Sequence, residues 1–266
     1  MKHQELGVVR KMNSRLENNE VHYQLPLGSD LLELNPLINR KIKLSFEKEI
    51  ICIKCNQKIK KTFAQGYCFP CFRDAPETSE CILRPELCKA HLGESRDLKW
   101  SKINCLTDQH IYMSFTGNLK IGVTRNTQIP TRWIDQGATK AIILCTTPNR
   151  YLAGLVEVYL KQFYSDRTHW IKMLSGNFEK PDFDACYQDA INHLNEKFQE
   201  YIVTSQWVEI NYPITSIPNK IKSFSFDKEQ VLEGELTGIK GQYLLFKENK
   251  VLNIRKHTGY KIKLEF

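Results

Sequence analysis

The chain has 266 residues, 41% of them apolar and 11% aromatic, and a formal net charge of +8. This composition excludes a largely disordered protein. No stretch approaches the roughly 18 consecutive apolar residues of a membrane span, and the first residues lack the apolar segment of a secretory signal. We therefore expect a cytoplasmic protein with no membrane partner, whose nine cysteines are metal ligands or buried thiols rather than disulfides.

Residues 1–51 alternate between apolar and polar side chains in the manner of strands. The expected strands are Leu6–Val9, Val21–Leu25 and Lys41–Ile53. They are too few to form a domain alone. Because chain ends often meet in space, we expect them to pair with strands at the C-terminus.

Basic residues are concentrated between Arg40 and Arg73. This segment contains nine basic residues and only two acidic ones, Glu47 and Glu49, so its net charge is +7. Such a cluster is typical of a protein that contacts a phosphate backbone. A solvated lysine-rich face would have the same composition. The candidate nucleic-acid contacts here are Lys41, Lys43, Lys58, Lys60 and Lys61.

The region 52–107 is rich in cysteine and contains two CxxC turns, Cys52–Cys55 and Cys68–Cys71. Each turn presents two thiolates, and four thiolates complete a closed tetrahedral shell, so the spacing predicts a structural Zn²⁺ ion in a zinc-ribbon-like module. The hairpin of that ribbon would lie at Lys58–Phe63, with Gly66 easing the turn into the second CxxC. Four buried thiols without a metal are the alternative.

A second metal site is predicted at Cys81, Cys88 and His91. Pro85 can open a short helix from which Cys88 and His91, three residues apart, would project together. Cys105 and His110 are both candidates for a fourth ligand. The alternative is a core cysteine beside a surface histidine, and Cys145 and Cys186 are expected to be ordinary core residues.

The region 108–178 predicts a compact α/β domain. Its expected strands are Ile111–Phe115, Leu119–Thr124 and Ala141–Cys145. A short helix is expected at Thr131–Gln136, and Thr147 and Pro148 are expected to cap a longer helix. Pro130 and Gly137 bound the short helix. An amphipathic helix near Asp184–Ile202 then fills a linking segment, 179–204.

This order of hairpin, helix, strand and helix resembles the GIY-YIG nuclease superfamily. The matching residues are Ile111-Tyr112 for the first signature, Lys120-Ile121-Gly122 for the second, Arg132 on the helix and the later Glu157. The lysine in the second signature is similar to the phage-type branch, which often carries KIG. The resemblance implies a three-stranded sheet with flanking helices over about 65 residues.

The resemblance also implies a metal-dependent cleavage of phosphodiester bonds. Tyr112 would help to activate the nucleophile, Glu157 would hold Mg²⁺ or Mn²⁺, and Arg132 would contact the scissile phosphate. Lys120 stands where the superfamily has a tyrosine, which suits phosphate contact or a domain that binds without cutting.

Each of these residues also has a plain structural interpretation. Glu157 and Lys161 form an i, i+4 pair, Tyr112 suits any strand, and Arg132 can lie over Trp133.

Across most of its length the chain also resembles an uncharacterised bacterial family known only as a domain of unknown function. The similar segments are Arg84–His91, Arg132–Ala138 and Gly238–Tyr243. This resemblance implies no activity.

The region 205–266 predicts short strands separated by Gly, Asn and Pro, and hence a small antiparallel β-barrel or sandwich. The expected strands are Trp207–Ile210, Ile221–Phe226, Val231–Leu236, Tyr243–Phe246, Val251–Ile254 and Tyr260–Phe266. Arg255, Lys256 and Tyr260 combine cations with an aromatic ring, which suits a single-stranded backbone with a stacked base. A solvated hairpin is the alternative.

Together these patterns predict an α+β protein with a Cys-rich module, a GIY-YIG-like domain and a β-domain. The expected function is binding of DNA or RNA with metal-dependent hydrolysis. A non-catalytic DNA-, RNA- or ribonucleoprotein-binding protein is the first alternative, and a zinc-stabilised scaffold for protein interaction is the second.

Overall fold

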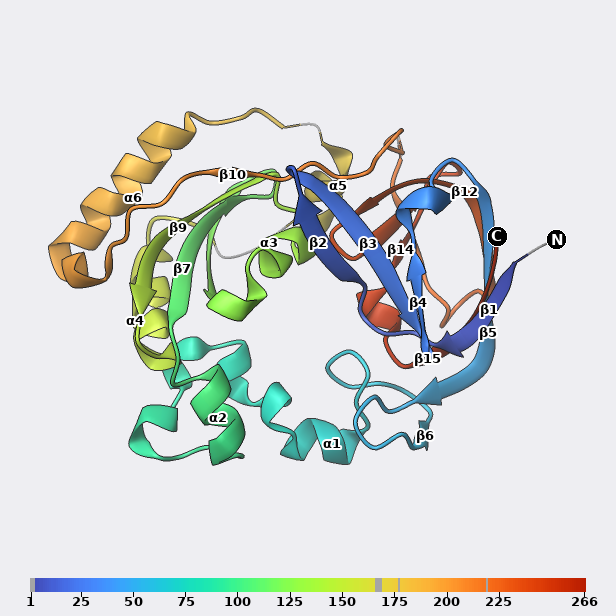
Figure 1. The fold of residues 1–266 in the computed structure, drawn as a ribbon, viewed down its shortest axis with the longest axis horizontal. Helices are drawn as coiled ribbons and strands as arrows, with labels where there is room; N and C mark the ends of the chain where they lie inside the picture. Colours follow the sequence, from blue (N-terminus) through green and yellow to red (C-terminus); the bar gives the residue numbers. More distant parts are fainter. Residues whose placement is uncertain (1–2, 166–168, 177, 219) are drawn as a thin grey trace. The chain divides into compact units, whose positions relative to one another are not determined.

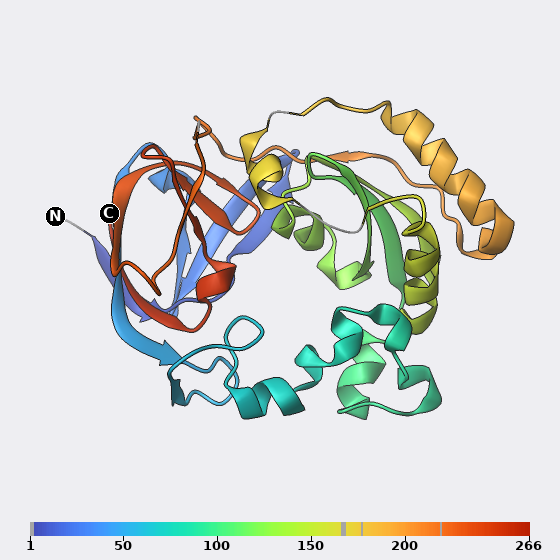
Figure 2. The ribbon, with the colours of Figure 1, turned by 180° about the vertical axis from the view of Figure 1, so that it is seen from behind.

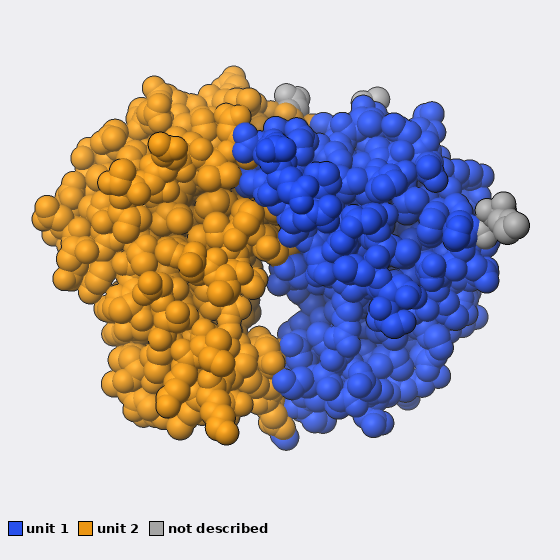
Figure 3. Space-filling view, viewed as in Figure 1, with its two compact units in different colours: residues 1–73, 210–266 blue, residues 74–209 orange. Residues whose placement is uncertain are grey.

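The computed structural model describes residues 3–165, 169–176, 178–218 and 220–266. The chain divides into two compact units, coloured separately in Figure 3: residues 1–73 with 210–266, and residues 74–209. Within the described ranges, none of the helices has the length and apolar character needed to cross a membrane.

The first unit is rich in strands (Figure 1). Its elements are β1 (Gln4–Val8), β2 (Asn13–Glu17), β3 (Glu20–Leu27), β4 (Asp30–Glu33), η1 (Asn35–Leu37), β5 (Lys41–Ile51), β6 (Lys58–Ile59), α1 (Phe69–Asp74), β11 (Lys222–Phe224), β12 (Val231–Lys240), β13 (Tyr243–Phe246), β14 (Lys250–Asn253), η8 (Arg255–His257) and β15 (Tyr260–Glu265). The strands β2 and β4 were not expected from the sequence, because both are short and have no fully buried residue.

Strands from the two ends of the chain share one sheet in the first unit. Its order is β1-β15-β5-β12-β13-β14-β11, and β6 pairs with β5. The described strands form an open path rather than a closed barrel. The expected all-antiparallel arrangement is also wrong at one edge, because β11 runs parallel to β14. A separate three-stranded sheet has the order β2-β3-β4.

The core of the first unit follows from the two-residue period of its strands. Alternate residues are buried along β3 and along β15, which places one side of each strand in the core. Gly7 of β1 passes so close to the β3–β4 turn that a Cβ there would lie 2.3 Å from Gly28 N. The N-terminal strand can therefore join the sheet only with glycine at this position.

The second unit combines a sheet with helices. Its elements are η2 (Pro76–Thr78), η3 (Glu80–Ile82), η4 (Pro85–Leu87), η5 (Ala90–Leu92), α2 (Leu98–Asn104), β7 (Gln109–Phe115), β8 (Leu119–Arg125), η6 (Asn126–Gln128), α3 (Thr131–Asp135), β9 (Lys140–Thr147), α4 (Arg150–Leu160), α5 (Trp170–Ser175), α6 (Phe183–Lys197), η7 (Gln199–Tyr201) and β10 (Val208–Glu209). The chain is thus a mixed α+β protein with several sheets.

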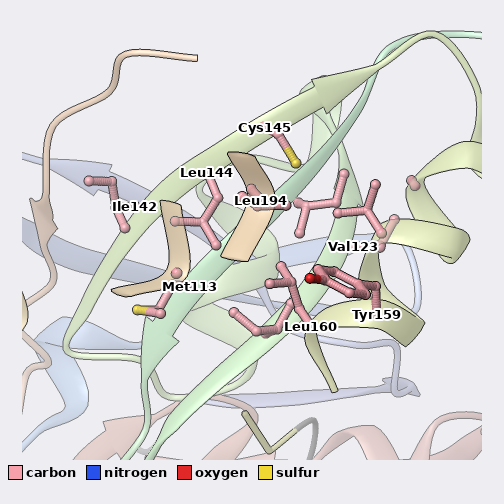
Figure 4. Close-up of a cluster of buried hydrophobic side chains, with 13 residues drawn as sticks. Met113, Val123, Ile142, Leu144, Cys145, Tyr159, Leu160 and Leu194 are labelled. Atoms are coloured by element: carbon pink, nitrogen blue, oxygen red, sulfur yellow. The ribbon is translucent and has the colours of Figure 1, made fainter. Parts of the chain in front are cut away.

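The sheet of the second unit has the order β10-β9-β7-β8. Strand β10 was expected in the C-terminal domain, but it pairs with β9. One face of the sheet packs Met113 against Leu160 of α4 and Leu194 of α6 (Figure 4). Ile111 and Val156 belong to the same buried cluster. Helix α6 lies beside α4 (Figures 1 and 2).

The other face of the sheet carries the alternate residues of β7, including Tyr112, whose ring meets Trp133 of α3 edge-on at 6.1 Å. Two differently covered faces follow from the alternation of side chains along β7. On the first face, α4 begins at Asn149, whose Oδ1 accepts a hydrogen bond from Leu152 N at 3.0 Å. This N-cap, rather than Thr147 and Pro148, fixes the start of the helix.

Candidate functional site

Two loops of the first unit bring four thiols together. Cys52 directly follows β5, Cys68 precedes α1, and Cys71 lies in its first turn. The sulfur atoms of Cys52, Cys55, Cys68 and Cys71 all lie within 4.8 Å of one another. Cys55 Sγ and Cys68 Sγ are 3.7 Å apart. This geometry can hold a metal ion.

The backbone around this cluster stabilises a thiolate. Burial tends to raise the pKa of Cys52, but hydrogen bonds from backbone N–H groups outweigh it and lower that pKa to about 6. One donor is Cys68 N, 3.2 Å from Cys52 Sγ. The neighbouring Cys68 raises the pKa of Cys71 to about 12. A cluster that shares protons in this way readily exchanges them for a cation, since metal ligation requires deprotonated thiols.

A second cluster of thiols lies in the second unit. The sulfur atoms of Cys81, Cys88 and Cys105 also lie within 4.8 Å of one another. Cys88 and Cys105 are buried, and Cys81 is partly exposed. Hydrogen bonds from Cys105 and Cys81 lower the pKa of Cys88 to about 2, and contact with Cys81 raises that of Cys105. This arrangement too can hold a metal ion.

His91, the third ligand expected at this site, is not part of the cluster. The segment forms two separate turns, η4 and η5, in place of one helix, and Cys88 after η4 has an extended backbone. The two side chains therefore do not share a helix face. The exposed ring of His91 stacks on Tyr151 at 4.4 Å, and His110 Nδ1 bonds to Thr146 at 2.8 Å.

The remaining two cysteines lie where the sequence placed them. Cys145 is fully buried in the core beneath α4, and Cys186 of α6 packs against the same core. Burial raises the pKa of Cys145 to about 12. A thiol held neutral in an apolar environment is a packing residue rather than a nucleophile.

Tyr112 occupies the middle of β7 and is fully buried. Its hydroxyl donates a hydrogen bond to Gln136 Oε1 at 3.0 Å. Gly122 lies directly opposite on β8, and a Cβ there would lie 2.5 Å from the Tyr112 hydroxyl oxygen. The glycine of the second signature therefore leaves the space that this phenol occupies.

Arg132 and Glu157 act on the same phenol from two different helices. Burial raises the pKa of Tyr112, the charge of Arg132 and its hydrogen bond to the phenol oppose that rise, and the charge of Glu157 adds to it. Arg132 is partly exposed. Glu157 is buried, with only 10% of its side chain exposed, and lies 3.4 Å from Lys161 Nζ. Two charged residues that are distant from Tyr112 in sequence therefore act on its phenol.

Lys120 belongs to this face of the sheet as well. It pairs with Ser114 of β7, two residues beyond the Tyr112–Gly122 pair, so its side chain leaves the sheet on the Tyr112 side. Lys120 is 5% exposed. Tyr112 itself does not meet solvent, because Trp133 and Gln136 pack against it.

The basic residues expected to contact nucleic acid differ in their surroundings. Lys41, Lys43 and Lys58 form ion pairs with Glu233 at 2.8 Å, with Glu265 at 3.6 Å and with Glu49 at 3.7 Å, respectively. Lys60 and Lys61 are exposed, and Lys61 Nζ lies 5.1 Å above the ring of Phe63. The local charge excess is thus partly neutralised along β5.

A cavity of about 590 Å³ in the first unit joins two of the expected basic segments. Lys61 and Gln65 line it from the loop between the CxxC turns, and Arg255 and Lys256 line it from η8. The Arg255 guanidinium donates a hydrogen bond to Gln65 Oε1. Positive charges about 190 residues apart in sequence therefore face one concave surface.

Tyr260 does not present the base-stacking face expected of it. It is 5% exposed, its ring packs on Phe46 at 5.0 Å, and its hydroxyl donates a hydrogen bond to Asp227. The alternation of β15 directs this side chain into the core. The ring therefore supports the cavity wall rather than a ligand.

A family model described as a protein of unknown function, DUF2797, matches residues 39–262. The chain belongs to the DUF2797 family. No curated protein and no solved structure matches the chain. The matched region of the DUF2797 chain contains both thiol clusters, the residues around Tyr112 and the basic cavity.

Three residues of the DUF2797 chain contribute to these sites although they were not assigned to a site from the sequence. Cys105 was only one of two candidates for a fourth ligand, Gln136 had no assigned role, and Arg150 was not considered. Arg150 donates hydrogen bonds to the carbonyl oxygens of Cys81 at 2.7 Å and Ile82 at 3.0 Å. An arginine at the start of a helix carries no sequence signal for such a contact.

Proposed function

We propose that this protein binds nucleic acid and that its second unit is a GIY-YIG-like module which hydrolyses phosphodiester bonds. The observation that carries the proposal is that Arg132 of α3 and Glu157 of α4 both act electrostatically on Tyr112 of β7. A partly exposed cation and a carboxylate are the groups that phosphoryl chemistry requires.

Each residue has a role that follows from its exposure. Arg132, partly exposed, would bind the scissile phosphate through its planar donor fork. Tyr112, enclosed and hydrogen-bonded to Gln136, would orient Arg132 rather than touch the attacking water. Lys120 would add positive charge on the same side of the sheet.

Glu157 is the residue suited to a divalent cation. Mg²⁺ is commonly held by one or two carboxylates together with water and substrate phosphates, so a single glutamate is an adequate protein contribution. When bound, such an ion would neutralise charge on the phosphate oxygens. Lys161 partly balances the carboxylate charge at 3.4 Å.

The first unit would supply most of the basic residues that bind the nucleic acid. Lys60 and Lys61 are exposed on the segment between the two CxxC turns, and the cavity lined by Arg255 and Lys256 adds further positive charge. We propose that the four-cysteine cluster holds structural Zn²⁺, because a closed shell of four thiolates suits that ion. The ion would fix the loop that carries these lysines.

A second candidate function is binding without cleavage. The complete burial of Tyr112 and the near-complete burial of Lys120 favour it, because neither side chain can reach a substrate in this conformation. In this case Arg132 and the basic cavity would only position phosphates.

Purified full-length protein tested on single- and double-stranded DNA and RNA with Mg²⁺ or Mn²⁺ separates the two candidates. For a nuclease we expect Glu157→Gln and Arg132→Ala each to lose at least ~100-fold in cleavage rate, the usual effect of removing a transition-state contact. Glu200→Gln and Arg84→Ala, both exposed, are matched controls that should retain full activity. Tight binding with no cleavage of any substrate would establish the second candidate.

Salt dependence tests the nucleic-acid partner itself. Replacing Lys60 and Lys61 with alanine should make the plot of log association constant against log salt concentration less steep by about 1 to 2. The reason is that binding releases fewer counterions when fewer phosphates are neutralised. Absence of salt-dependent binding to any nucleic acid would refute both candidates.

A further inference from the structure

The cluster of Cys81, Cys88 and Cys105 supplies three sulfur ligands for one ion. We infer that it is a second metal centre, separate from the four-cysteine cluster, whose fourth coordination position takes a small donor from outside the protein. Among the described residues, no other His, Cys, Asp or Glu joins these three sulfur atoms within 4.8 Å. A tetrahedral thiophilic ion such as Zn²⁺ has four positions, so three thiolates leave one for an exchangeable ligand.

The surroundings supply the charge balance that such a centre needs. Three thiolates and a divalent cation carry a net charge of −1, which is costly to bury without a counter-charge. The guanidinium of Arg150 hydrogen-bonds to the backbone of Cys81, and its positive charge acts on both Cys81 and Cys88. Arg125 interacts electrostatically with Cys105. The protein therefore places cations beside these thiols and not only apolar atoms.

The segment around the cluster contains little regular secondary structure, although η4 packs against α4. It consists of the short turns η2 to η5 and helix α2, and its own buried core is Cys88, Ala90 and Cys105, against which Trp100 and Tyr151 pack. The three cysteines come from η3, from the end of η4 and from the end of α2. An ion bound by all three would cross-link these elements, which small cores commonly require.

A cavity gives an external donor access to the cluster. It has a volume of about 330 Å³ and is lined by all three cysteines and by Trp100. Two carboxylates also line it, but Glu80 pairs with Arg84 at 3.3 Å and Glu94 pairs with Lys89 at 3.3 Å. The space is sufficient for water, imidazole or a small thiol, the donor classes that borderline-soft cations accept.

Metal content of the purified full-length protein tests the centre. We expect about two ions per chain in the wild type and about one in Cys105→Ser and in Cys81→Ser, because loss of one of three thiolates removes most of the affinity. His91→Ala is the matched control and should retain both ions. Cys81 is partly exposed, so its replacement should disturb folding less than replacement of the buried Cys105. The Cys81→Ser variant therefore still tests the centre if Cys105→Ser fails to fold.

Cobalt substitution tests the exchangeable position. The difference spectrum between the Co²⁺ forms of the wild type and Cys81→Ser isolates this centre, and imidazole should shift its d–d bands while leaving the spectrum of the closed four-cysteine site unchanged. A spectrum insensitive to imidazole, or one altered by Glu80→Gln or Glu94→Gln, would overturn the external donor. A single ion per wild-type chain, or a disulfide among the three cysteines, would overturn the metal centre.

Discussion

Gly154 lies in the second turn of α4, where the helix passes the backbone of η4. A Cβ at this position would lie 2.1 Å from Glu86 N and 2.4 Å from Pro85 C. Replacement of glycine by alanine inside a helix normally stabilises a protein by about 1 kcal/mol. The Gly154→Ala variant should do the opposite, because backbone atoms cannot rotate away as a side chain can.

The size of this effect follows from the contact. Restoring an ordinary separation of at least 3.4 Å requires α4 and η4 to move apart by more than about 1 Å. Forcing a methyl group into a packed contact costs about 1–3 kcal/mol. The same movement weakens the hydrogen bond from Arg150 N to Cys105 O, 2.8 Å long, worth about 0.5–1.5 kcal/mol. After subtraction of the helix gain, we expect a net loss of about 2 kcal/mol.

Thermal unfolding monitored by circular dichroism measures this loss. For a chain of this size a loss of about 2 kcal/mol lowers Tm by about 4–8 °C. Gly93→Ala is a useful comparison, since an added Cβ there would meet nothing within 4 Å although its φ is +80°. A Gly154→Ala variant that melts above the wild type would refute the close approach of α4 and η4.

Three further outcomes are expected. Gly122→Ala should destabilise the protein by about 1–3 kcal/mol in chemical denaturation, because its methyl group would overlap the Tyr112 hydroxyl, and an unchanged midpoint would contradict the packing of that ring. Burial lowers the pKa of Lys240 to about 8 from 10.5, so the unfolded chain binds more protons between these values and stability should rise as pH increases through them. Lys240→Met should flatten that rise, and an identical pH profile for both proteins would count against the burial. Cys55→Ser should lose the ion of the four-cysteine site and become sensitive to proteolysis between residues 52 and 71, since that loop has few buried residues; retention of all metal by elemental analysis would disprove its role as a ligand.

The close spacing of the two CxxC turns was enough to predict the first thiol cluster. Two ligands within one turn have a geometry fixed by the local backbone, so Cys52–Cys55 and Cys68–Cys71 could be paired without knowing the fold. The second cluster could not be completed in this way. Cys105 is 17 residues from Cys88, and its place depends on how α2 packs on the turns before it.

The central strands were predictable for a similar reason. Apolar periodicity and the residues Pro130 and Gly137 define β7, β8, β9 and α3 locally. Strand β10 was expected in the right place in the sequence but grouped with the C-terminal strands, because a two-residue strand shows no partner in its own sequence. Its pairing with β9 is a long-range contact.

The sequence by itself determined the types of element, the four-thiol site and the order of the residues Tyr112, Arg132 and Glu157 along the chain. All of these depend on interactions between near neighbours or on residue identity. Only the tertiary structure decided that Tyr112 is enclosed, that Tyr260 faces the core and that Cys105 replaces His91. Burial and metal geometry depend on which distant surfaces meet, and that is set by the packing of whole elements rather than by any local pattern.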